Sequence, residues 1–123
     1  MKDLETREDL ELLLGEFYQV ATKDDEIGHH FIDLDLKTHL PTIVNFWEKI
    51  LFGKPIYFGN PLAVHKILNE KSPLLLEHFD RWIVIFNGMI DKYFEGEIAE
   101  AAKLRAKMIA GSLGKRINES PVV

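Results

Sequence analysis

A chain of 123 residues, with 46% hydrophobic and 28% charged residues, has the size and composition of one folded domain. The net charge of -5 argues against a nucleic-acid partner, because phosphate binding needs clustered lysines and arginines. The absence of cysteine excludes disulfides, thiolate metal sites and a cysteine nucleophile. The N-terminus lacks the apolar core of a signal peptide and no apolar run reaches the ~18 residues of a membrane span, so we expect a cytoplasmic protein without a membrane partner.

The first predicted element is a helix that begins at Thr6 and ends near Lys23. Asp9 follows Thr6 by three residues, which is the spacing of a helix start with an acidic first turn. Apolar residues then recur at helical spacing, at Leu10, Leu13, Leu14, Phe17, Tyr18 and Ala21. A corner that contains two adjacent histidines follows over residues 24–35.

The second predicted helix begins at Thr38, which is expected to be its N-cap, and places Pro41 in the first turn. Gly53 ends this helix. Its apolar face comprises Leu40, Ile43, Val44, Trp47, Ile50 and Leu51. After a loop, Pro61 opens a short helix that extends to about Asn69.

The last part of the chain predicts two further helices, over residues 75–94 and 97–113, separated by Gly96. No stretch shows the sustained alternation that is typical of strands, so the sequence predicts an all-α fold. We expect a single domain over residues 1–117, followed by a disordered tail over residues 118–123.

Two histidines stand on separate apolar helices and are candidates for chemistry. His65 is either a core histidine that donates to a carbonyl or an axial ligand of haem iron. His39 is either an exposed first-turn residue or a group on the wall opposite His65. Taken alone, Tyr18 and Trp82 have the pattern of ordinary core residues. Two apolar walls, each with an imidazole, could enclose a flat apolar cofactor with a metal at its centre.

Three motifs in order make the pattern specific. They are H-L-P-x-x-x-x-F-W from His39, N-P-x-x-x-H ending at His65 and H-F-x-R-W ending at Trp82. With them, residues 6–113 resemble the truncated haemoglobins, bacterial haemoglobin-like proteins, and within them group III. The resemblance implies a globin-like two-over-two helical sandwich.

The resemblance also implies a role for particular residues. It implies that His65 is the metal ligand of haem b, with a five-coordinate iron. It implies a distal ligand-binding site formed by Tyr18, His39, Ile43 and Trp82. The expected cofactor contacts are Phe31, Ile43, Phe46, Trp47, Tyr57, Leu62, Lys66, Leu68 and Phe86. His39 would also allow a six-coordinate state when no ligand is bound.

The function that the resemblance implies is the binding of O2, NO, CO or similar small ligands. A hydrogen bond to a charged acceptor contributes ~1.5–3 kcal/mol, so several distal donors imply slow ligand release. Slow release suits NO dioxygenase or peroxidase activity, with a reductase as electron donor, better than transport. The alternatives are a globin-like sensor or interaction module without turnover, and a helical bundle without a cofactor. A monomer or weak dimer is expected.

Overall fold

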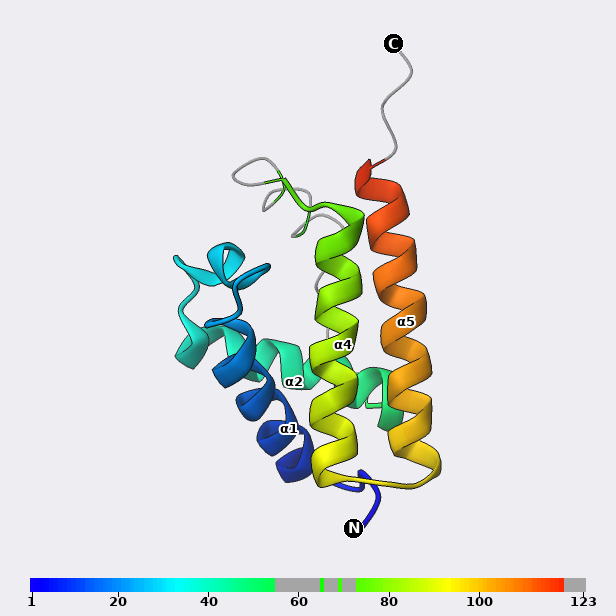
Figure 1. Cartoon of the computed structure of the whole chain (residues 1–123). Helices are drawn as coiled ribbons and strands as arrows, with labels where there is room; N and C mark the ends of the chain where they lie inside the picture. Colours follow the sequence, from blue (N-terminus) through cyan, green and yellow to red (C-terminus); the bar gives the residue numbers. More distant parts are fainter. Residues whose placement is uncertain (55–64, 66–68, 70–72, 119–123) are drawn as a thin grey trace.

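The computed structural model describes residues 1–54, 65, 69 and 73–118. Within these residues the fold has four α-helices, a short 3-10 helix and no strand, which confirms the all-α prediction. In chain order the elements are α1 (Arg7–Ala21), η1 (Gly28–Phe31), α2 (Leu36–Phe52), α4 (Leu76–Tyr93) and α5 (Glu97–Asn118). Figure 1 shows α4 and α5 side by side and antiparallel, with α1 against α4 and α2 crossing behind. None of the described helices is both long and apolar enough to cross a membrane.

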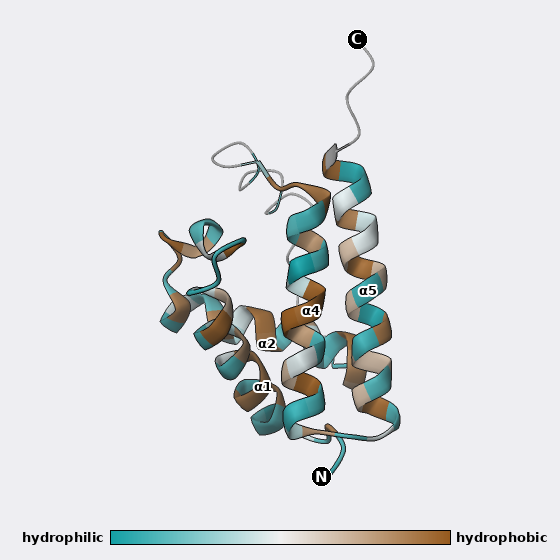
Figure 2. Cartoon of the chain, viewed as in Figure 1, coloured by the Kyte–Doolittle hydropathy of each residue, from teal (hydrophilic) through white to brown (hydrophobic). Residues whose placement is uncertain are grey.

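The core lies where α1, α2 and α4 meet. Figure 2 shows brown and teal bands alternating along the helices, as expected when one face of each helix is buried. Phe17 of α1 and Phe86 of α4 are fully buried and their rings lie 5.8 Å apart, edge to face. Phe86 stacks on Trp47 of α2 at a centroid distance of 5.0 Å and on Trp82 at 4.9 Å. These aromatic rings therefore fix the position of α4 relative to the other two helices.

The start of α1 lies where the sequence predicted it, and a capping box holds it. The Thr6 side chain accepts a hydrogen bond from the backbone N–H of Asp9 at 3.2 Å. The Asp9 carboxylate accepts one in return from the backbone N–H of Thr6 at 3.1 Å. Two N–H groups without partners inside the helix are satisfied in this way.

The start of α2 differs from the prediction, because Thr38 is not its N-cap. The helix begins at Leu36 with Asp35 as N-cap, and Thr38 donates a side-chain hydrogen bond to the Asp35 carboxylate at 2.9 Å. Leu36 packs against the core, and this burial favours extending the helix upstream of Thr38. As a result, Pro41 lies inside α2 rather than in its first turn.

Two other predicted helices end or lie next to residues that the structure does not describe. The last helix, α5, continues beyond the expected end at Leu113 to Asn118. The remaining residues of the expected tail, 119–123, lie outside the described residues. So does most of the short helix expected over residues 61–69, of which His65 and Asn69 are described and are helical.

The N-terminal arm caps α5 from the opposite end of the sequence. The Asp3 carboxylate accepts hydrogen bonds from the backbone N–H groups of Ile98 at 2.9 Å and Ala99 at 2.8 Å. The preceding Gly96 has φ 141, and a Cβ there would collide with the Asp3 side chain. Leu4, next to Asp3, is fully buried. The arm therefore joins the first and last helices of the fold.

Replacing Asp3 with alanine should lower the free energy of unfolding by about 0.5–2 kcal/mol, the range found when a helix loses its N-terminal cap. The reason is that two N–H groups at the start of α5 lose their acceptors. Urea denaturation followed by circular dichroism would measure the change. Glu5→Ala removes an exposed carboxylate from the same arm and serves as the control. An Asp3→Ala midpoint equal to that of the control would contradict the capping role.

Candidate functional site

Tyr18 lies on the inner face of α1 and is 7% exposed. Its ring is edge-on to Phe31 at 5.7 Å and to His39 at 6.2 Å, so α1, η1 and α2 contribute to one cluster. Burial raises the pKa of the Tyr18 phenol above its usual value. Among the described residues, no hydrogen bond to this hydroxyl is found. The phenol therefore stays protonated near neutral pH and can donate a hydrogen bond.

His39 lies near the start of α2 and is half-buried. Burial lowers the pKa of His39, and the charge of His65 lowers it further. The two side chains therefore lie close enough in the fold for the charge of one to act on the other, although they are far apart in the sequence. His65 itself is also half-buried. His39 is consequently neutral at pH 7 and can donate or accept a hydrogen bond.

Trp82 of α4 is connected to Tyr18 through the ring of Phe17, which contacts both. It is half-buried, stacks on Phe86, and its ring centroid lies 5.5 Å from that of Phe17. Phe86 in turn stacks on Trp47. Trp82 is therefore held in place by the core while part of its surface stays accessible.

The other expected cofactor contacts fall into three groups. Ile43 and Phe46 are half-buried on α2, as side chains that border a ligand site would be. Trp47 and Phe86 are buried within the aromatic core, where Phe86 stacks between Trp47 and Trp82. The last group lies outside the described residues and comprises Tyr57, Leu62, Lys66 and Leu68.

The comparisons with known proteins identify the family of the chain. No protein-family model matches the chain. A curated relative, a group 3 truncated hemoglobin of Campylobacter jejuni, is 31% identical over 110 residues, which cover 85% of this chain and 84% of the relative. The chain belongs to the group III truncated haemoglobins. The crystal structure of the group III truncated hemoglobin from the same organism matches this truncated haemoglobin with a TM-score of 0.85 at 28% identity, over 100% of both chains.

Family membership confirms the resemblance that the three motifs indicated, and the structural match confirms the truncated-globin fold. As a truncated haemoglobin, the chain is a globin-type haem protein that binds small ligands. The roles of individual residues in this chain stay predictions, and the geometry described above is what supports them.

One contact in this truncated haemoglobin was missed by sequence reasoning. The Asp24 carboxylate, at the corner after α1, accepts hydrogen bonds from Arg81 Nε at 3.0 Å and Arg81 Nη2 at 2.8 Å. These bonds from Arg81 hold the pKa of Asp24 below its usual value, and backbone N–H groups of the corner lower it further. The pair fixes the corner, and with it Phe31, to the helix that carries Trp82. Nothing in the sequence pairs two charges that are 57 residues apart.

Proposed function

We propose that this protein holds haem b through His65 and binds O2, NO, CO or similar diatomic ligands beside Tyr18, His39 and Trp82. The observation that carries the proposal is the buried Tyr18 side chain, whose ring adjoins that of His39 and whose hydroxyl makes no hydrogen bond to a described residue. When bound, haem supplies an iron that accepts such ligands and exchanges single electrons.

The residues present fit this cofactor. A porphyrin needs apolar walls, and large apolar side chains in the described region are half-buried rather than buried, namely Phe31, Ile43, Phe46 and Trp82. Their accessible surface would leave water when a flat apolar group packs on it, which stabilises the complex. His39 and His65 bring two imidazoles into the same region. One imidazole is enough to hold the iron, and we assign that role to His65.

Tyr18 is the principal donor to the ligand in this proposal. Burial keeps its proton in place at physiological pH, and its edge-on contacts with Phe31 and His39 fix the ring. A hydrogen bond to an acceptor that carries negative charge contributes ~1.5–3 kcal/mol, which slows release of the ligand by about ten- to a hundredfold. The indole N–H of Trp82 is a second donor and the His39 ring a third.

Slow release favours chemistry on the ligand over its transport. We propose that the protein supports NO detoxification or peroxidase-type redox chemistry, with a reductase as the source of electrons. In the first reaction, NO, O2 and one electron give nitrate. Mixing the ferrous protein under O2 with NO and measuring nitrate distinguishes this activity from simple ligand storage.

The haem assignment is tested by the absorption spectrum. Purified protein, or apoprotein reconstituted with haemin, should show a Soret band at one haem per chain, and the pyridine haemochrome spectrum should be that of haem b. The spectrum of the ferrous unliganded protein should be five-coordinate, with His39 unbound. Colourless protein that haemin cannot reconstitute would refute the proposal.

A further inference from the structure

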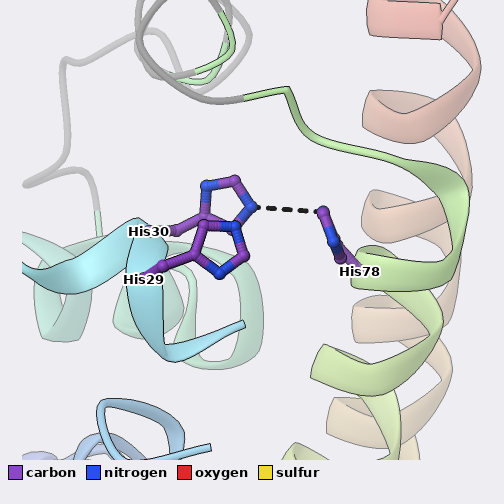
Figure 3. Close-up of side chains that lie close together, drawn as sticks. All are labelled: His29, His30 and His78. Atoms are coloured by element: carbon purple, nitrogen blue, oxygen red, sulfur yellow. Dashed lines mark hydrogen bonds between the residues drawn. The ribbon is translucent and has the colours of Figure 1, made fainter. Parts of the chain in front are cut away.

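Three histidines gather at a second place, away from His39 and His65. His29 and His30 belong to η1, and His78 lies in the first turn of α4. Figure 3 shows both η1 rings directed toward the His78 ring. One ring nitrogen from each of the three lies within 4.8 Å of those from the other two. The cluster thus connects two elements that are 48 residues apart in sequence.

The spacing of the nitrogens suits a shared metal ion. His30 Nε2 lies 3.2 Å from His78 Nδ1, whereas two nitrogens bound to one tetrahedral zinc ion lie about 3.4 Å apart. The ring centroids lie 4.0 Å apart for His29 and His30, and 4.9 Å apart for His30 and His78. Small rotations of these rings would bring three nitrogens to metal-binding distance. His78 Nδ1 would then bind the ion in place of the backbone N–H of Leu75, from which it accepts a hydrogen bond in the metal-free chain.

The protonation state of the His30 ring also suits a metal ligand. Its side chain is buried, and burial, followed by the charges of His29 and His78, lowers the pKa of His30 to about 4. The ring is therefore neutral at pH 7, which is the form that binds metals. Its second nitrogen, Nδ1, is buried without a hydrogen-bond partner among the described residues, and it would carry the ring proton when Nε2 binds the ion.

We propose that His29, His30 and His78 form a site for a divalent transition-metal ion of the zinc class. The group contains imidazoles and no carboxylate, a ligand set that suits zinc, copper or nickel rather than calcium or magnesium. His29 is exposed, which gives the ion an entry path and leaves a coordination position open to water.

A metal here would join η1 to α4. It would act beside the Asp24–Arg81 ion pair, which already connects the same two parts of the fold. Phe31 follows His30 directly and packs on Tyr18, so the ion would also steady one side of the haem pocket. Because the ion binds the folded chain, it should raise the temperature of unfolding.

Isothermal titration of the untagged, haem-loaded protein with zinc chloride tests the site. In the proposed haem complex the region of His39 and His65 is occupied, so these rings would not compete for zinc. We expect saturable binding of one zinc per chain. His29→Ala should weaken it at least about tenfold, since loss of even an outer-shell partner of a metal ligand costs ten- to a hundredfold. His29 is exposed, so this variant should fold normally.

His78→Gln is the second variant, and it separates metal binding from folding. His78 Nδ1 accepts a hydrogen bond from the backbone N–H of Leu75 at 3.1 Å, and glutamine commonly makes the same contact at this helix position. The variant keeps the cap, loses the imidazole, and should also bind zinc at least about tenfold more weakly. Glu26→Gln changes an exposed carboxylate near the corner and should bind zinc as the original protein does.

The proposal is overturned if the original protein shows no saturable binding of one zinc, or if His29→Ala and His78→Gln bind zinc as tightly as Glu26→Gln. Comparing these variants isolates the cluster whether or not haem is present, so the test does not depend on the proposed function.

Discussion

Replacing His65 with alanine should weaken haem binding by at least about a hundredfold and abolish the globin-type visible spectrum. The physical reason is that the variant loses the nitrogen proposed to hold the iron, whereas apolar packing against the porphyrin remains. Loss of an outer-shell partner already weakens metal binding ten- to a hundredfold, so loss of the ligand itself should exceed that range. Haemin titration of the apoprotein, followed at the Soret band, measures the change.

A control and a rescue sharpen this experiment. His29→Ala removes an exposed imidazole outside the haem region and should leave haem affinity unchanged. Free imidazole added to the His65→Ala variant should restore part of the original spectrum by entering the space left by the side chain. If His65→Ala bound haem as tightly as His29→Ala and with the same spectrum, another residue would hold the iron.

Tyr18→Phe should raise the rate of O2 dissociation from the ferrous protein by about ten- to a hundredfold, the equivalent of one hydrogen bond to a charged acceptor. The ring keeps its packing against Phe31 and His39, and the structure shows no protein partner for the hydroxyl among the described residues. The stability of the fold should therefore change little. Stopped-flow displacement of O2 by CO gives the rate.

Tyr93→Phe is the matched control for this substitution. Tyr93 lies at the far end of α4, and its hydroxyl donates to Glu16 at 3.4 Å, remote from the proposed ligand site. It should leave O2 dissociation unchanged. Trp82→Phe should increase the rate as well, because it removes the second donor. If Tyr18→Phe released O2 at the same rate as Tyr93→Phe, Tyr18 would not contact the ligand.

The sequence was sufficient for the helices because the signals that form them are local. Apolar residues at helical spacing predicted all four described α-helices, and the spacing of Thr6 and Asp9 predicted the start of the first. Gly53 ends α2 with φ 70, a conformation that glycine adopts without strain. The start of α2 was misplaced because burial of Leu36 outweighed the local signal at Thr38.

The residues of the site could be predicted only in part, and only from the resemblance of the sequence motifs to the truncated haemoglobins. Each of the four candidate residues, taken alone, fitted an ordinary structural role; they are Tyr18, His39, His65 and Trp82. The order of the three motifs indicated that they share one ligand-binding site. The structure adds that Tyr18, Phe31 and His39 are neighbours and that the charge of His65 acts on His39. Four of the expected cofactor contacts, Tyr57, Leu62, Lys66 and Leu68, stay predictions from the resemblance.

The sequence by itself determined which segments are helical and which face of each is apolar, because capping, glycine conformation and hydrophobic spacing act over a few residues. Only the tertiary structure decided which distant polar groups meet. Asp3 caps α5, Asp24 pairs with Arg81, and His30 reaches His78, each across a long stretch of chain. Such pairings depend on how the helices pack against one another, and no local pattern in the sequence encodes them.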